Sequence, residues 1–171
     1  MPADPATAAT AVEAIRADLA RLLDGDDAHM RFEEAVDSFP EEAMNRRGPK
    51  MPYTPWHLLE HLRITQWDIL EYVRDRHHVS PAWPVGYWPA EDATATPEQF
   101  RATVTAFIAD RTALRRLVTS RDSDLLAVLP GTPGHTLLRE VRIAADHNAY
   151  HVGEFAVLRQ VMGTWPSDRM S

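Results

Sequence analysis

Three histidines, His61, His147 and His151, have the residue type and the spacing to bind a divalent metal ion. His147 and His151 are four residues apart, and residues at that spacing in a helix lie on one face with Cβ atoms about 5–6 Å apart. Their two imidazoles can therefore bind the same ion. The spacing is also common by chance in soluble helices, so a structural or solvated pair is an equally good interpretation of these two residues alone.

His61 is the third predicted ligand, and it favours the metal hypothesis. It lies on a different predicted helix, inside the apolar stripe of that helix, where a polar ring needs a partner. Three uncharged histidines that meet in a core have six ring nitrogens to satisfy, and a metal ion would bind three of them. Three protein ligands leave coordination positions open for water or substrate, and the ion would then act as a Lewis acid on a water or a thiolate.

Other residues could compete for this site or support it. His57 forms a second pair with His61 at a spacing of four, but it lies on the flank of the apolar face, where we expect a residue at the rim or the surface. Glu60 and Glu154 could accept a hydrogen bond from a ligand or carry a proton, although solvated glutamates are commoner on helix faces. A surface or helix-end position is the simpler interpretation of the remaining histidines, which are His29, His77, His78 and His135.

The composition restricts both the metal site and the partners. The sequence has no cysteine, which excludes disulfides, thiolate ligands and a cysteine nucleophile, so any metal must be bound by His, Asp or Glu. A net charge of −7, with Lys50 as the sole lysine, argues against a nucleic-acid-binding surface. The first residues do not resemble a signal peptide, and no segment approaches the ~20 apolar residues of a membrane span. We therefore expect a cytoplasmic protein that acts on a small molecule and binds neither nucleic acid nor a membrane.

The elements that must position these histidines are helices. Apolar residues recur at intervals of three and four in the segments 8–23, 54–76, 97–119 and 136–162, and a short helical continuation is expected over 28–36. His61 falls in the second of the long segments and the pair His147 and His151 in the fourth. No segment alternates as a strand does, so we predict an all-α four-helix bundle that forms a single domain over residues 1–171.

The predicted helix ends follow from local chemistry. Thr54-Pro55 and Thr96-Pro97 each combine an N-cap with a proline at the first helical position, where the missing amide hydrogen has no bond to lose. Gly25 and Gly163 are expected to stop the first and the last helix. These residues therefore predict where the helices begin or end.

The segment 80–96 is too rich in proline for a helix and, over 80–89, too rich in aromatic residues for an ordinary solvated loop. It should pack on the bundle. One hypothesis is a lid over the metal, with an aromatic wall for a small ligand. The alternative is a loop that caps the end of the bundle with its tryptophans buried.

From about residue 28 to residue 165 the sequence resembles the DinB-like superfamily, which includes the DinB and YfiT branches of bacterial metal-binding four-helix bundles. The matching segments are 28–36, 55–63, 83–89 and 146–151, and the last of them carries the histidine pair. The resemblance implies that His61, His147 and His151 are the ligands of a zinc, nickel or iron ion. It also implies an up-up-down-down order of helices and frequent homodimers. Characterised relatives include transferases that use low-molecular-weight thiols such as bacillithiol or mycothiol.

Two functions of different classes are consistent with these residues. The first is a metal-dependent enzyme that activates a thiol or a water for attack on a small substrate, as a thiol S-transferase or a hydrolase does. The alternative is a noncatalytic metal-binding or stress-related bundle protein, whose site is structural or senses metal. The sequence identifies no further catalytic residue and does not specify the substrate.

Overall fold

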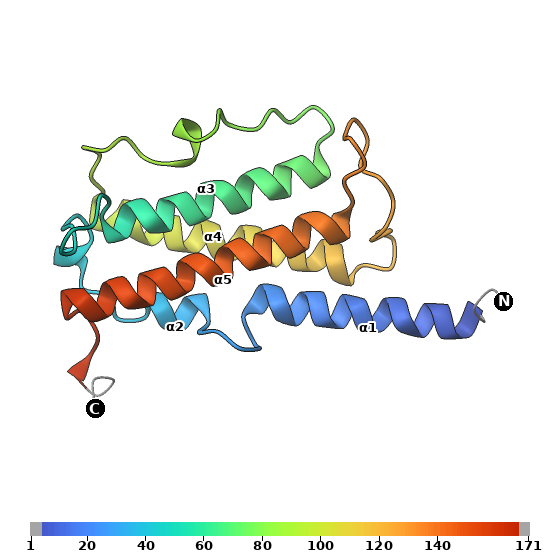
Figure 1. The fold of residues 1–171 in the computed structure, drawn as a ribbon, viewed down its shortest axis with the longest axis horizontal. Coiled ribbons are helices and arrows are strands. Elements are labelled where there is room, and N and C mark those ends of the chain that lie inside the picture. The colour runs from blue at the N-terminus through green and yellow to red at the C-terminus, as the bar shows by residue number, and fades with distance from the viewer. Residues whose placement is uncertain (1–4, 168–171) are drawn as a thin grey trace.

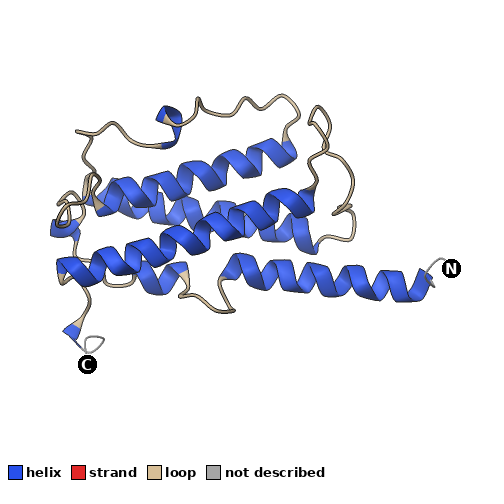
Figure 2. Cartoon of the chain, in the orientation of Figure 1, coloured by secondary structure: helices blue, strands red, loops and turns tan. Residues whose placement is uncertain are grey.

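The computed structural model describes residues 5–167 of the chain, and four long helices make up most of this part. They are α1 (Pro5–Asp24), α3 (Pro55–Arg74), α4 (Pro97–Thr119) and α5 (Leu137–Met162). The shorter elements are α2 (Phe32–Val36) and two 3-10 helices, η1 (Glu41–Ala43) and η2 (Val85–Tyr87). Figures 1 and 2 show the helices packed side by side, and residues 5–167 contain no named strand. The predicted all-α class is confirmed.

The helix ends agree with the capping chemistry expected from the sequence. The side chains of Thr54 and Thr96 accept hydrogen bonds from the backbone N–H groups three residues later, and a proline follows each of them. Gly25 and Gly163 adopt positive φ angles of 76° and 63° after α1 and α5, a conformation that favours glycine. The continuation expected over 28–36 is helical only from Phe32, because the chain first turns through the residues that follow Gly25.

The order of helix directions differs from the up-up-down-down arrangement expected from the resemblance. In Figure 1, α3 and α4 run in the same direction, while α1 and α5 run in the opposite direction. The order is therefore up-down-down-up. The physical cause is the segment 75–96, which leaves the end of α3 and returns along the length of that helix before α4 begins, whereas a short turn would have made α4 antiparallel.

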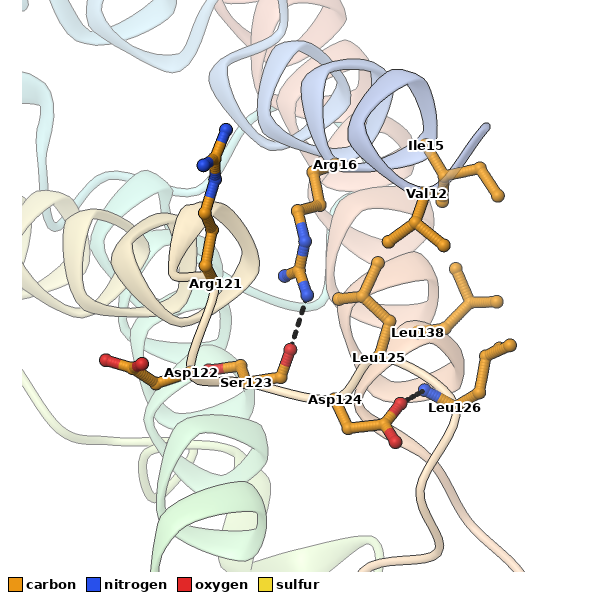
Figure 3. A pocket seen from close by; sticks show the side chains of 10 residues that line it. All are labelled: Val12, Ile15, Arg16, Arg121, Asp122, Ser123, Asp124, Leu125, Leu126 and Leu138. Atoms are coloured by element: carbon orange, nitrogen blue, oxygen red, sulfur yellow. Dashed lines mark hydrogen bonds between the residues drawn. The ribbon is translucent and has the colours of Figure 1, made fainter. Parts of the chain in front are cut away.

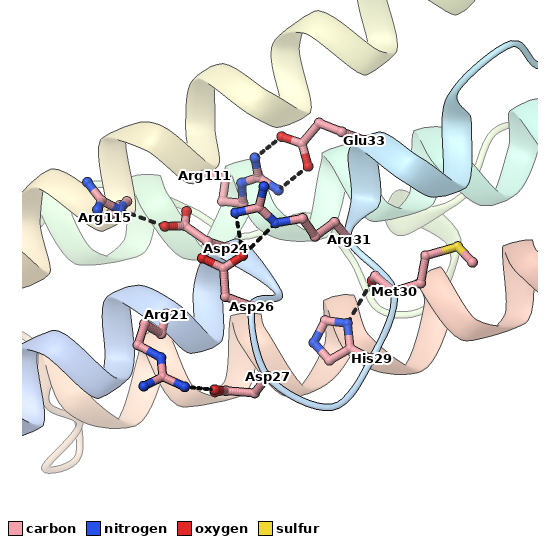
Figure 4. Close-up of polar contacts among 10 residues, drawn as sticks. All are labelled: Arg21, Asp24, Asp26, Asp27, His29, Met30, Arg31, Glu33, Arg111 and Arg115. Atoms are coloured by element: carbon pink, nitrogen blue, oxygen red, sulfur yellow. Dashed lines mark hydrogen bonds and ion pairs between the residues drawn. The ribbon is translucent and has the colours of Figure 1, made fainter.

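The junction between α1 and α2 is held by ion pairs rather than by regular structure. Figure 4 shows Arg111 of α4 paired with Glu33 of α2, and Arg115 of α4 paired with Asp24 at the end of α1. Burial by itself would raise the pKa of Glu33, but its hydrogen bonds and the charge of Arg111 outweigh this and lower the pKa. As a result α2 continues the line of α1 along one side of the bundle (Figure 1).

Two apolar clusters fill the interior at different heights along the bundle. The first surrounds Phe107 and Phe155 at the end near α2 and η1, and it includes Leu58 and Leu62 of α3. The second lies where α1 packs and includes Leu114 and Val141. Within the described residues, no helix is both long enough and apolar enough to span a bilayer.

The variant Phe107→Ala should lower the free energy of unfolding by about 3–5 kcal/mol, the usual loss for a large aromatic side chain in a core. Phe107 is 1% exposed and its ring centroid lies 4.0 Å from that of Phe32. Urea denaturation followed by circular dichroism measures the effect. Val79→Ala, at an exposed position in the segment between α3 and η2, is the control and should change stability by less than about 0.5 kcal/mol. Equal losses in the two variants would contradict the assignment of the core.

Candidate metal centre

The three predicted ligands meet between α3 and α5. Nε2 of His61 lies 3.1 Å from Nε2 of His147 and 3.3 Å from Nε2 of His151. One ligand atom from each ring lies within 4.8 Å of the others. Metal–nitrogen bonds of about 2.0–2.1 Å place two nitrogens on the same ion roughly 2.9–3.4 Å apart. The two measured separations have the value expected for nitrogens that share one ion.

The hydrogen bonds of the outer nitrogens determine which ring atoms are free to bind a metal. Nδ1 of His61 lies 2.8 Å from the carbonyl oxygen of Tyr87, which can only accept, so this nitrogen carries the proton. Nδ1 of His151 lies 2.6 Å from the Glu154 carboxylate and carries the proton for the same reason. With the Nδ1 protons so placed, the neutral form of each ring has a bare lone pair on Nε2, and the two Nε2 atoms face each other. They cannot bond to each other, and a shared cation satisfies both.

His147 completes the candidate ligand set as a neutral ring. Burial, and then the neighbouring rings of His151 and His61, lower the pKa of His147 to about 3. Burial also lowers the pKa of His61, although the Tyr87 carbonyl opposes that change. Metal ions bind the neutral imidazole, so the lowered pKa of His147 keeps this ring in the metal-binding form at neutral pH. Within residues 5–167, Nδ1 of His147 has no hydrogen-bond partner.

A carboxylate and a phenol extend the site beyond the ligands. Glu154 lies one turn after His151 on α5, and its second oxygen accepts a hydrogen bond from the Tyr53 hydroxyl. Carboxylates in this position fix the ring orientation of a ligand histidine and raise its basicity. The sequence suggested Glu154 as one of two acceptors. It gave no sign of Tyr53, because this residue reaches α5 from the loop before α3 and not from a helix period.

The segment 75–96 forms the outer wall of the site. The ring of Trp88 stacks on that of His61 with centroids 4.0 Å apart and an interplanar angle of 5°, and the ring of Tyr53 lies beside Trp88, with centroids 5.3 Å apart. The segment runs along α3 (Figure 1), so a cap at the end of the bundle with buried tryptophans does not describe it. Trp83 in particular is 76% exposed. The Trp88 ring lies beside His61, as the lid hypothesis expects of this segment, and its role as a lid over a metal stays a prediction.

The expectation that His57 lies at the rim or the surface is wrong. His57 is 3% exposed rather than at the rim, because its ring folds back over the start of α3, where Nδ1 accepts a hydrogen bond from the backbone N–H of Thr54. His57 is thus part of a capping box, a role usually filled by Glu or Gln. Glu60, one of the two possible acceptors for a ligand histidine, faces α4 instead of the histidine cluster, since its carboxylate pairs with Arg63 at 2.6 Å and accepts from Thr103 at 2.8 Å.

The other histidines lie away from the three ligands and have local partners, as expected of residues with structural roles. His29 contacts the carbonyl of Met30, His77 follows the end of α3, His78 binds Asp68, and His135 contacts Tyr72. The grouping of metal-ligating side chains found within residues 5–167 contains none of these four.

A cavity of about 340 Å³ lies at a different place, between α1 and the segment 121–126 (Figure 3). The guanidinium of Arg16 points into this junction and donates to the carbonyl oxygens of Val118, at 2.6 Å, and Ser123. These carbonyls belong to the end of α4 and the residues after it, where a positive side chain is favourable. Arg16 therefore fastens α1 to α4, and the cavity shares no residue with the histidine cluster.

The sequence profile described as the DinB superfamily matches residues 25–155 of the chain. The chain belongs to the DinB superfamily. The match includes all three histidines and the segment that covers them. No curated protein and no solved structure matches the chain. Membership of the DinB superfamily and the buried cluster of three histidines together fit a metal-binding protein.

Substitution of the individual histidines tests the ligand set. His61→Ala, His147→Ala and His151→Ala should each weaken zinc binding by more than the ~10–100-fold loss that follows removal of an outer hydrogen-bond partner. Calorimetric titration of metal-free protein with zinc or nickel measures this. His57→Ala should keep most of the affinity, while losing about 1–3 kcal/mol of stability with its cap and its burial. Loss of binding in His57→Ala but not in His61→Ala would show that the third ligand is wrong.

The lowered pKa of His147 makes the stability of the metal-free protein depend on pH. Between about 6.5 and the folded value of about 3, the unfolded chain binds a proton at this residue and the folded chain does not. The free energy of unfolding should therefore be highest above pH 6.5 and decrease as the pH falls. Urea titrations of chelator-treated protein from pH 7.5 to 5 measure the slope, which should be smaller in His147→Gln. Identical slopes would mean that folded His147 is protonated.

Proposed function

We propose that this member of the DinB superfamily is a metal-dependent enzyme, in which His61, His147 and His151 hold one divalent ion for reaction of a thiol or a water with a small electrophile. The supporting observation is the pair of bare Nε2 atoms of His61 and His151, 3.3 Å apart, with Nε2 of His147 beside them. A donor set of three imidazoles suits zinc or nickel best, and iron is also compatible.

When bound, the ion would supply Lewis-acid chemistry, which makes a water or a thiol a better nucleophile at neutral pH. Three protein ligands are the number found in catalytic zinc sites, whereas structural zinc sites usually have four. The chain has no cysteine, so a thiol nucleophile would have to come from a low-molecular-weight cosubstrate. The number of protein ligands therefore favours a catalytic metal site over a purely structural one.

The residues around the ligands have roles that suit such a reaction. Glu154 holds the Nδ1 proton of His151 and is itself held by the Tyr53 hydroxyl, which keeps the imidazole in the tautomer that binds metal. Trp88 and Tyr53 provide apolar ring surface next to the ligands, which excludes water from one side and can pack against a small substrate.

The proposal includes a homodimer, as is frequent in proteins that this sequence resembles. Three large apolar residues of α5, Tyr150, Val157 and Val161, are exposed at intervals of seven and four residues. Residues at these intervals lie on one face of the helix, and a second copy could cover that face by the same contacts. Tyr150 also packs on His151, with ring centroids 4.8 Å apart, so such an interface would adjoin the metal centre.

The alternative function is a noncatalytic metal-binding or stress-related protein, and a screen for turnover separates the two. Zinc- or nickel-loaded protein is incubated with low-molecular-weight thiols and electrophilic substrates, and separately with hydrolysable esters. The enzyme hypothesis predicts product formation that requires the metal and is lost in His147→Ala. Tight metal binding without metal-dependent turnover of any thiol or ester would favour the noncatalytic function.

A further inference from the structure

Asp68 is a carboxylate buried in the face of α3 that the segment 75–96 covers. It is 7% exposed, and both of its oxygens have donors from that segment. Oδ2 accepts from the Tyr87 hydroxyl at 2.6 Å, and Oδ1 lies 2.7 Å from Nε2 of His78. Removing the donors of a buried carboxylate leaves a desolvated charge, which is strongly unfavourable. The bonds to Asp68 therefore hold the segment firmly on α3.

Tyr87 connects this carboxylate to the metal centre, because it contacts α3 at two points. Its hydroxyl donates to Asp68, and its backbone carbonyl accepts from Nδ1 of His61, two turns earlier on the same helix. The ring of the next residue, Trp88, stacks on the ring of His61. The position of η2 on α3 therefore sets both the proton acceptor and the ring contact of His61.

The turn that presents Tyr87 is compact, so a displacement at one point is transmitted to the other. The backbone N–H of Gly86 donates to Ala82 at 2.7 Å, and that of Tyr87 donates to Pro84 at 3.1 Å. A Cβ atom at Gly86 would lie 2.7 Å from Cβ of Pro81, which is too close for any side chain. The tight packing leaves little room for the Tyr87 carbonyl to move independently of its hydroxyl.

We propose that Asp68 is a positioning residue for the metal centre, which acts through Tyr87 to fix the tautomer and the orientation of His61. This inference rests on the proposed metal site. With Tyr87 held, the carbonyl keeps the proton on Nδ1 and leaves Nε2 bare toward His147 and His151. Docking of the segment 75–96 and binding of the ion then stabilise each other, since both require His61 to carry its proton on Nδ1.

The opposing interpretation is that Asp68 only fastens the segment and affects stability alone. Tyr87→Phe separates the two, because it removes the hydroxyl and keeps the backbone carbonyl. The matched control is Tyr72→Phe on α3, the helix that also carries Asp68 and His61. It removes a hydroxyl that lies 2.8 Å from Nδ1 of His135, which is not one of the three proposed ligands. Each variant loses one side-chain hydrogen bond of a tyrosine hydroxyl, to the Asp68 carboxylate in the first and to the His135 ring in the second, but only the first is connected to His61.

Zinc affinity, measured by competition with a chromophoric chelator, should fall by about 10–100-fold in Tyr87→Phe and Asp68→Ala, the loss typical of outer hydrogen-bond partners. Tyr72→Phe should leave the affinity unchanged. Asp68→Asn keeps an oxygen that can accept from the Tyr87 hydroxyl, so it should lose less affinity than Asp68→Ala. Affinities equal to wild type in Tyr87→Phe and Asp68→Ala would overturn the proposal, as would an equal loss in Tyr72→Phe.

A second measurement on metal-free protein keeps this test independent of the proposed function. The ¹⁵N shifts of an imidazole distinguish a protonated from a bare nitrogen, and in wild type they should place the His61 proton on Nδ1. In Tyr87→Phe the two tautomers should mix, and in Tyr72→Phe they should not. If wild type bound no zinc but this difference appeared, the positioning role would be supported and the metal-site proposal would fail. An unchanged Nδ1 tautomer in Tyr87→Phe would overturn the positioning role.

Discussion

The arrangement of this protein depends on the need to satisfy polar side chains buried between α3 and α5. The Nε2 atoms of three imidazoles face one another there. An adjacent layer contains the buried amides of Gln66 and Asn148. Asn148 donates to Gln66 at 2.7 Å, and Gln66 donates to the backbone carbonyl of Phe107 on α4 at 2.6 Å. Such networks are stable only when every member has a partner, so they fix the register of the three helices more sharply than apolar packing does.

This polar layer also explains why the interior consists of two apolar clusters rather than one. Along α3, Leu58 and Leu62 belong to one cluster and Ile69 to the other, with Gln66 between them. Along α5, Val141 and Phe155 belong to different clusters, and the histidine pair lies between them. The two apolar clusters provide the driving force for folding, and their packing fixes the position of the polar layer between them. A metal site placed there is supported by rigid helices on both sides, which is the arrangement that preorganises ligands best.

The long connection between α3 and α4 covers the candidate metal site on one side. Since α3 and α4 are parallel, the chain must travel back along the bundle, and it does so over the face of α3 that carries His61. The return segment supplies a carbonyl, a hydroxyl and an indole ring to that face. A short antiparallel connection would have left His61 open to solvent on this side, with neither a defined tautomer nor an aromatic wall.

Much of the fold and the candidate ligand set could be predicted from the sequence alone. The periods of three and four, the Thr-Pro starts and the glycine stops are local properties, so they predicted the four long helices and the apolar faces on which His61, His147 and His151 lie. Non-local geometry decided the rest. No local rule shows that Tyr53 reaches Glu154, or that Asp68 and His61 share Tyr87, because each contact joins residues that only the packed bundle brings together. The capping box of Thr54 and His57 is a local contact, but histidine is not the residue type that the capping pattern predicts at that position. The direction of α4 was likewise fixed by where the segment 75–96 finds partners for its polar groups, which is a property of the whole surface of α3 and not of the segment itself.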